Sequence, residues 1–283
     1  MKPVLLLTTL ILFYSAVTFP FTSYVKSRPV IEKIGYVPEP DALKLLSADQ
    51  HQFTSASLMM SLISYYGSLA EQAPNEVYAK PEFPAMQKMV EAAVQLDPYN
   101  MDAYYFAEAM VWFTGQVTAT NRMLEYGMHY RDWDFYLPYF AGFNYAFFLK
   151  DYASAAKYYQ RVGALTGTDL PMTLAGRYLY EAGRTDMAIS YLSLMVKNAG
   201  NEAVKKALQT RLDAFLAVRK IEIAADLFQK KLHRRPLSPR ELLLSGYLSK
   251  IPVDPYGGIF YIDVQGKVRS TSKFAFGVAG RFQ

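Results

Sequence analysis

Apolar residues recur at helical spacing through most of the chain. In segment 58–69 they lie three or four residues apart, which predicts one amphipathic helix that ends near Gly67. The apolar positions of this segment are Leu58, Leu62, Tyr65, Tyr66 and Leu69. Prolines interrupt the next segment, 71–84, so we expect a loop there. A further helix is predicted to stop at Asp97-Pro98.

Three later segments are similar to one another, each with two helical patterns joined by a turn. They are residues 103–127, 139–163 and 173–196. Their turns fall at Gly115, Lys150-Asp151 and Gly183, so consecutive turns are about 35 and 33 residues apart. A fixed period of this length indicates a helical-repeat architecture.

Side-chain size within the repeats fits pairs of closely packed helices. Small residues occur where the two helices must approach, and large ones occur where space between them must be filled. The small residues are Ala107, Ala141, Gly142, Ala155, Ala175, Gly176 and Ala188. The large residues are Tyr104, Val111, Leu124, Tyr145, Tyr159, Leu179 and Leu192. We expect both sets to lie between the helices.

The chain after the repeats predicts more helix and then a β-hairpin. Segment 201–231 is interpreted as another helical pair, with apolar positions Leu208, Leu212, Phe215, Ile223, Leu227 and Leu232. The sequence "SPRE" at 238–241 predicts a helix start with a Ser cap, Pro at the first position and a capping-box Glu. Two strands, "IFYID" and "KVRSTS", are joined through 264–266. Because stacked repeats need terminal caps, we expect this tail to cover an exposed apolar face.

The first apolar stretch, residues 3–25, has no charged side chain. At about 1.5 Å per residue it is long enough to cross a hydrocarbon core of about 30 Å. A cleavable signal has a shorter apolar run and a small-x-small exit, and Tyr14 stands where a site at Ala16 needs a small residue. We expect an uncleaved signal anchor, with a cleaved signal or a hydrophobic core helix as alternatives.

The charges around this stretch give two opposing indications of orientation. Lys2 precedes it, whereas Lys26, Arg28 and Lys33 follow it, and this Lys/Arg count favours a body on the cytoplasmic side. A very short flank before an apolar run is typical of export signals. We favour export, which predicts a single-pass inner-membrane protein with a periplasmic body.

Composition narrows the chemistry that the chain can perform. Its 283 residues are 52% hydrophobic and 15% aromatic, enough for a packed core, and none is Cys. The absence of Cys excludes disulfides, thiolate metal sites and Cys nucleophiles. The three histidines, His51, His129 and His233, have no metal-ligand spacing, and Gly257-Gly258 lacks the Lys-Ser/Thr of a phosphate loop. We expect no metal, no cofactor and no catalytic residue, although a repeat scaffold can assemble a site from distant positions.

A basic cluster follows the predicted helical pair. Its members are Lys230, Lys231, Arg234, Arg235 and Arg240. Clustered cations can attract anionic lipid or an acidic partner. The alternative is a solvated helix end, where cations complement the helix dipole. No nucleic-acid-binding motif accompanies the cluster, so we expect no nucleic-acid partner.

The repeat segments resemble the tetratricopeptide repeat family. The similarity lies in "DYASAAKYYQR", in "GRTDMAISYL" and in "LDPYN", which resembles the usual ending of a repeat. The resemblance implies an α-solenoid whose first helix in each pair faces ligand. The ligand-facing positions that it implies are Tyr105, Trp112, Tyr139, Phe143, Arg177 and Tyr180. Such aromatic residues can grip a peptide, and Arg177 can bind a carboxylate. The alternative is that they pack between helices.

The tail carries a second resemblance. The run "GYLSKIPVDPYGGIFYI" is similar to the region after the helix in type II secretion pseudopilins and their type IV pilin-like relatives. Those proteins carry a prepilin cleavage site before an amino-terminal helix, and residues 3–25 contain nothing that looks like one. As a whole, the chain looks like membrane-linked tetratricopeptide repeat proteins of Gram-negative bacteria.

Taken together, these patterns predict an all-α, tetratricopeptide-like helical-repeat solenoid with a transmembrane helix at 1–27. Its repeat domain is expected at 28–235, with the clearest repeats at 103–196, and a helix plus β-hairpin cap at 236–283. We expect a non-enzymatic scaffold that binds protein or peptide partners in an envelope assembly, with secretion and type IV pilus systems as candidates. The alternatives are an envelope enzyme acting on peptidoglycan or sugars, and a purely structural oligomer subunit.

Overall fold

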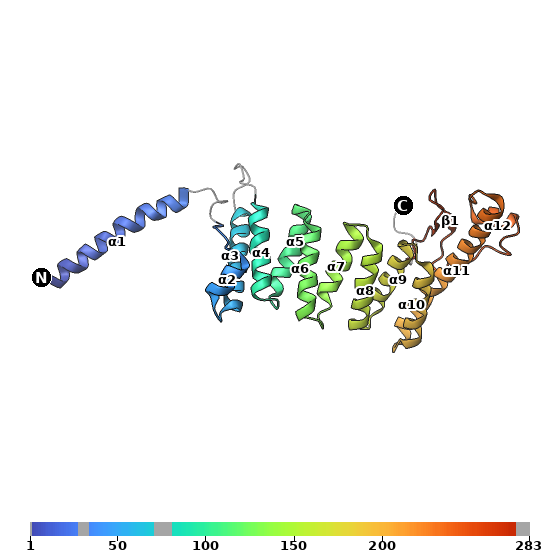
Figure 1. Cartoon of the computed structure of the whole chain (residues 1–283), viewed down its shortest axis with the longest axis horizontal. Helices are drawn as coiled ribbons and strands as arrows, with labels where there is room; N and C mark the ends of the chain where they lie inside the picture. The colour runs from blue at the N-terminus through green and yellow to red at the C-terminus, as the bar shows by residue number, and fades with distance from the viewer. Residues whose placement is uncertain (1, 28–33, 71–80, 276–283) are drawn as a thin grey trace. The chain divides into compact units, whose positions relative to one another are not determined.

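The structure, a computed structural model, describes residues 2–27, 34–70 and 81–275. These residues form twelve helices and one two-stranded antiparallel sheet. The chain divides into two compact units, residues 1–131 and 132–283. Within each unit, apart from the first helix, helices that are neighbours in sequence lie side by side (Figure 1). The expected mostly helical architecture of stacked helix pairs is confirmed. The boundary at Arg131 falls inside the range 28–235 that was expected to form one repeat domain.

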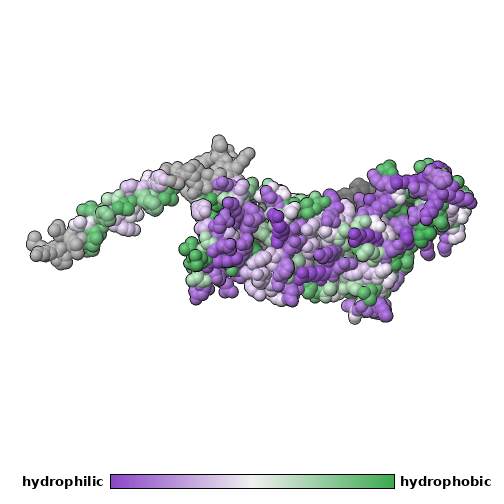
Figure 2. Space-filling view, viewed as in Figure 1, coloured by the Kyte–Doolittle hydropathy of each residue, from purple (hydrophilic) through white to green (hydrophobic). Residues whose placement is uncertain are grey.

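The first helix is the apolar one. Helix α1 (Lys2–Ser27) continues through Pro20, and its window Leu7–Val25 is long and apolar enough to cross a membrane, with none of it buried against the protein. Apolar side chains (green) run along much of this helix in Figure 2. The helix predicted over 3–25 is therefore confirmed, and it is compatible with a single span or a signal sequence.

The amino-terminal unit continues with five further helices. They are α2 (Pro40–Ser47), α3 (His51–Ala70), α4 (Phe83–Leu96), α5 (Met101–Thr114) and α6 (Val117–Tyr130). Most of the predicted loop 71–84 lies outside the described residues, but its last two residues begin α4. Pro84 is tolerated there because the first turn of a helix needs no backbone N–H from it. Helix α4 ends at Leu96, as the Asp97-Pro98 signal predicts.

The seam between α5 and α6 is closed by one tyrosine. Tyr104 is fully buried, and its hydroxyl donates a hydrogen bond to the Pro98 carbonyl at 3.0 Å. Its ring lies against Gly127, where an added Cβ would be 2.5 Å from the hydroxyl oxygen and 2.6 Å from Cζ. The helices approach closely here because position 127 has no side chain.

The carboxy-terminal unit contains the remaining elements. They are α7 (Tyr136–Phe147), α8 (Tyr152–Thr166), α9 (Asp169–Glu181), α10 (Thr185–Asn198), α11 (Glu202–Leu232), α12 (Pro239–Leu244), β1 (Phe260–Ile262) and β2 (Val268–Ser270). The turns predicted at Lys150-Asp151 and Gly183 separate α7 from α8 and α9 from α10. At the first of these, Asp151 caps α8 by accepting a 3.1 Å bond from the Ser154 amide. The hydroxyl and amide of Ser154 lower the pKa of Asp151 below its usual range.

The small and large residues that were expected to lie between paired helices are buried almost without exception. Every small residue of the set lies at or near zero exposure, and Tyr145 alone among the large ones is partly exposed. Tyr145 instead stacks on Tyr158, with ring centroids 5.5 Å apart. The size pattern of the sequence therefore predicts the helix seams.

The interpretation of 201–231 as a helical pair is wrong, because the structure has one helix of 31 residues there. Asn201 caps it by accepting hydrogen bonds from the amides of Ala203 and Val204, and no Gly or Pro interrupts it before His233. One apolar face therefore runs the whole length. Its buried residues include Leu208, Leu212 and Phe215, as expected, and then Ile221, Ala224 and Phe228. Ile223, Leu227 and Leu232 are exposed instead.

The tail forms the predicted hairpin. Phe260 pairs with Ser270 and Ile262 with Val268, and the Asp263 carboxylate closes the turn by accepting from the amides of Gln265 and Lys267. Ser238 caps α12 as predicted, whereas Glu241 accepts from the Leu237 amide one residue before the capping-box position. The tail is buried against α9 and α11 through Phe260, Val268 and Phe274.

Replacing Gly127 with Ala should lower the free energy of unfolding by about 1–3 kcal/mol, because the new methyl group overlaps the ring of Tyr104. Gly67→Ala is the matched control, since Gly67 lies inside α3 with no atom within 4 Å of an added Cβ. The control should gain about 0.5–1 kcal/mol from helix propensity. Urea unfolding followed by circular dichroism measures both. Equal effects of the two substitutions would contradict the close approach at Gly127.

Candidate functional site

Two predicted ligand-facing residues are exposed on α5 in the amino-terminal unit. Tyr105 is 43% exposed and Trp112 is 60% exposed. They are seven residues apart, so they lie on one face of the helix. This placement agrees with a surface position and not with packing between helices.

Three of the predicted residues in the carboxy-terminal unit are half-buried. The ring of Tyr139 meets Tyr159 edge to face at 5.6 Å, and the ring of Phe143 stacks on Phe147 at 5.3 Å. Arg177 is partly exposed on α9. Tyr139 therefore packs against α8, whereas the stack of Phe143 on Phe147 lies within α7.

Tyr180 is placed differently from the expectation. It is 1% exposed, its ring stacks on Phe215 at 5.1 Å, and its hydroxyl donates to the Val268 carbonyl of the hairpin. Burial raises the pKa of Tyr180, so its hydroxyl stays protonated. The residue holds the tail in place through this bond and is not exposed on an open helix face. The cause is the tail, which covers this part of α9.

A cavity of about 300 Å³ lies beside Tyr180, between α9 and the tail. Its lining comes from α9, both strands and the residues after them: Arg177, Tyr180, Glu181, Tyr261, Arg269, Ser270, Lys273 and Phe274. Glu181 accepts from Lys267 Nζ at 3.0 Å and pairs with Arg269 at 3.3 Å. Of the six predicted ligand-facing residues, Arg177 and Tyr180 line this cavity.

The basic cluster is fully on the surface, but two of its members have structural contacts. Arg234 pairs with Glu241 at 2.5 Å and lies over the ring of Phe228 at 4.8 Å. Arg235 donates to the Gln265 carbonyl at 2.7 Å and so holds the hairpin turn. The remaining members, Lys230, Lys231 and Arg240, are exposed. The contacts of Arg234 and Arg235 favour a structural interpretation for these two members of the cluster.

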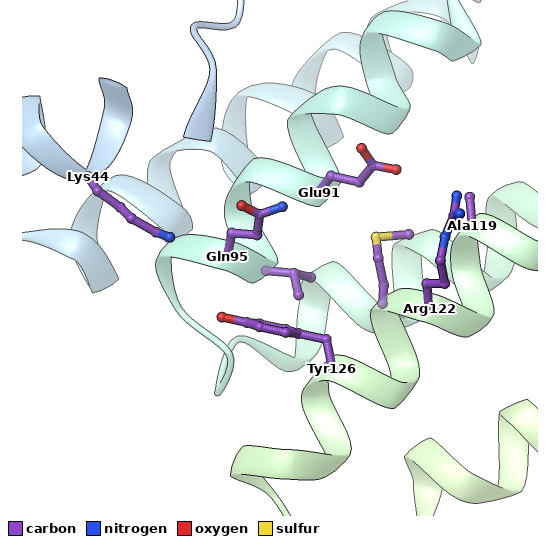
Figure 3. A pocket seen from close by; sticks show the side chains of 8 residues that line it. Lys44, Glu91, Gln95, Ala119, Arg122 and Tyr126 are labelled. Carbon is purple, nitrogen blue, oxygen red and sulfur yellow. The ribbon is translucent and has the colours of Figure 1, made fainter. Parts of the chain in front are cut away.

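A second cavity, of about 350 Å³, lies in the amino-terminal unit between α2, α4 and α6 (Figure 3). Lys44 and Arg122 bring positive charge to it, Glu91 brings a carboxylate, and Gln95 and Tyr126 bring neutral polar groups. Its apolar lining is Val94, Ala119 and Met123. The sequence did not predict this cavity, because its residues come from three helices and lie outside the positions that the family resemblance implies.

The polar side of this cavity contains a perturbed tyrosine. Burial raises the pKa of Tyr126 to about 12, and the hydrogen bond to the Tyr130 hydroxyl, at 3.3 Å, adds to the shift. Tyr126 therefore remains a neutral hydrogen-bonding group at physiological pH. In Figure 3 its ring lies across the cavity from Glu91 and reaches toward Gln95 and Lys44.

The histidines have local structural contacts. His51 Nδ1 is 2.7 Å from the Ser47 hydroxyl, and His129 Nδ1 is 2.8 Å from the Glu125 carbonyl. His233 ends α11 in the left-handed conformation, with φ of 53°. Within the described parts of the chain, no group of three or more His, Asp or Glu residues could hold a metal ion.

The shifted pKa of Tyr126 makes a testable difference at high pH. At pH 11 a tyrosine of pKa about 12 is roughly 10% ionised, whereas one of pKa about 10 is roughly 90% ionised. Subtracting the ultraviolet titration of Tyr126→Phe from that of the parent should reveal one tyrosine still mostly protonated at pH 11. Tyr126 ionises at a lower pH in the unfolded chain than in the folded one. Its contribution to the free energy of unfolding is therefore complete below pH 10 and is lost as the pH rises toward 12. In the Tyr130→Phe chain the pKa of Tyr126 should fall only part of the way, because burial is the larger cause of the shift. An unchanged titration would contradict a contribution from the Tyr126–Tyr130 hydrogen bond.

Comparison with protein-family models, with curated proteins and with solved structures finds no match to this chain. The tetratricopeptide and pseudopilin resemblances therefore stay predictions. The structure itself establishes a mostly helical protein of stacked helix pairs, with one apolar helix at its amino terminus and a small hairpin at its carboxy-terminal end.

Proposed function

We propose that this protein is a non-enzymatic scaffold that binds protein partners in an assembly of the bacterial cell envelope. In this proposal α1 holds the chain in the inner membrane and the helical body lies in the periplasm. Secretion and type IV pilus systems are the assemblies that the tail resemblance suggests. The observation that carries the proposal is the exposure of Tyr105 and Trp112 on one face of α5.

Large aromatic side chains on a regular helix suit protein recognition. Trp and Tyr are enriched among the residues that carry most of the energy of an interface. They offer a large contact area at a low cost in side-chain entropy, because each has only two side-chain torsions. Since α5 is packed between α4 and α6, these side chains project from a backbone that is already ordered. A partner therefore meets a preformed surface.

Photo-crosslinking tests the proposed surface. A benzophenone amino acid at position 112 should capture one dominant envelope protein in the native host, because Trp112 is expected to lie at the centre of the contact. Position 53 is the matched control, since Phe53 is 71% exposed but lies on α3. The chain with Tyr105→Ser and Trp112→Ser should lose the partner in a pull-down. Retention of the same partner by that double variant would refute the proposed surface.

Cysteine labelling tests the proposed location, because the parent chain has no Cys and gives no background. Lys206 is exposed on α11, so Lys206→Cys should react with a membrane-impermeant maleimide in intact spheroplasts. A Cys inserted after Met1 should react only after the membrane is permeabilised. Protection of Lys206→Cys would place the body in the cytoplasm. A mature chain whose mass lacks residues 1–27 would identify a cleaved signal.

A further inference from the structure

The cavity between α9 and the tail has more positive than negative lining. Three cations, Arg177, Arg269 and Lys273, face one acid, Glu181. That acid is already paired, since Lys267 Nζ lies 3.0 Å and Arg269 Nη1 lies 3.3 Å from its carboxylate. Glu181 therefore has little charge left to neutralise the other two cations.

Arg177 and Lys273 are the cations without an acidic partner. Among the residues that the structure describes, neither makes an ion pair. Arg269, by contrast, has a second acid in Asp263, at 2.6 Å from its Nε. The two unpaired cations come from elements almost a hundred residues apart, and the fold brings them to one cavity.

A third cation, Arg211 of α11, has unsatisfied donors nearby. Its guanidinium lies over the rings of Tyr256, at 5.0 Å, and Phe215, at 5.9 Å. Its Nε and Nη1 are buried and donate to no described residue. Burial lowers the pKa of Arg211, and the like charge of Arg177 lowers it further. Buried donors without acceptors are costly, so this arrangement is suited to receiving an acceptor.

The acid that faces Arg211 is Asp254, and its carboxylate is largely taken. It accepts hydrogen bonds from the hydroxyls of Ser270 and Ser272 and from the Tyr256 amide. Asp254 raises the pKa of Arg211 but does not receive a hydrogen bond from its buried donors. An anion from outside the described chain would therefore meet uncompensated positive charge in this corner of the unit.

We propose that this cavity binds a carboxylate of an acidic peptide segment from a protein partner, with Arg177 and Lys273 as its principal contacts. The volume of about 300 Å³ is at the small end for ligand sites and suits one side chain or chain end. Tyr261 and Phe274 supply aromatic walls for the attached carbon chain. Arginine binds carboxylates in a bidentate geometry. Arg211 does not line the cavity, but it is close enough to Arg177 for their charges to interact. The proposal rests on the proposed function only in taking the partner to be a protein.

Peptide binding to the full chain in neutral detergent tests this site. The probes are fluorescein-labelled pentaglutamate and pentaglutamine, followed by fluorescence anisotropy at about 0.15 M salt, where long-range attraction is screened. The parent should bind pentaglutamate about tenfold or more tightly than pentaglutamine. The chain with Arg177→Gln and Lys273→Gln should lose that preference. Lys230→Gln with Lys231→Gln is the matched control, because it removes the same charge from exposed positions outside the cavity.

Three results would overturn the site. One is equal weakening in the two double variants, which would indicate general attraction to a basic protein. Another is no preference of the parent for pentaglutamate up to millimolar peptide. The third is loss of binding to vesicles containing anionic lipid in the cavity variant while pentaglutamate binding is unchanged, which would assign the cavity to a lipid headgroup. Crosslinking at position 112 in the cavity variant separates the two proposals. If the cavity variant still captures the partner but the peptide test fails, the proposed cavity site is refuted and the proposed function is not.

Discussion

The close approach of paired helices at small residues is the constraint on which both units depend. Where Gly127 faces Tyr104, and where Gly176 faces Leu192, an added Cβ would lie less than 3 Å from the opposing side chain. The absence of a side chain at these positions lets a large residue fill the seam completely, and dense packing of this kind is the main source of stability in a helical repeat. The surface features, including the exposed face of α5, are positioned by these seams.

In the carboxy-terminal unit the contacts between α9 and the tail depend on the packing of α9 against its neighbouring helices. Once α9 is packed, Glu181 and Tyr180 present a carboxylate and a hydroxyl to the hairpin, and Lys267, Arg269 and the Val268 carbonyl bind them. The polar bonds fix where the tail lies, and its buried apolar residues Phe260, Val268 and Phe274 join the core of the unit. The cavity is a by-product of this arrangement, because a two-stranded hairpin does not cover α9 completely. Its positive lining comes from Arg269, which pairs with Glu181, and from Arg177 and Lys273, which do not.

The sequence predicted the helix pairs well because their signals are local. Glycine turns and small seam residues repeat at a nearly fixed period, and the burial of Ala107 and Ala188 follows from that period. The hairpin was also predictable, since two strand-forming runs and the turn between them lie within one short segment. By contrast, α11 was misread because a long helix and a helical pair share the same spacing. What separates the two is whether a Gly or Pro breaks the segment, and none follows Asn201 before the end of α11. The absence of such a residue is a weaker signal than its presence.

The candidate sites were harder to predict, for a physical reason. Exposure of Tyr105 and Trp112 follows from their place on a helix, so a local pattern suffices. The environment of Tyr180 depends on Val268, which is 88 residues later in the chain, and no local pattern reports such a contact. The same limit applies to Arg211, whose unsatisfied donors become apparent only when the residues around it are assembled. The sequence therefore predicted the helical architecture, but of the residues that line the cavity it singled out only Arg177 and Tyr180.

The long reach of the tail has a consequence for biosynthesis. The rings of Tyr180 and Phe215 are covered by Phe274, with centroids 5.3 Å apart in each case, so this core is incomplete until residue 274 has been made. At a translation rate of about 5–20 residues per second, the helices α9 to α11 spend several seconds with part of their apolar surface uncovered. A chain that stopped before residue 274 would leave the rings of Tyr180 and Phe215 without this cover. Completion of this core therefore waits for the tail, although the helices that it covers are made first.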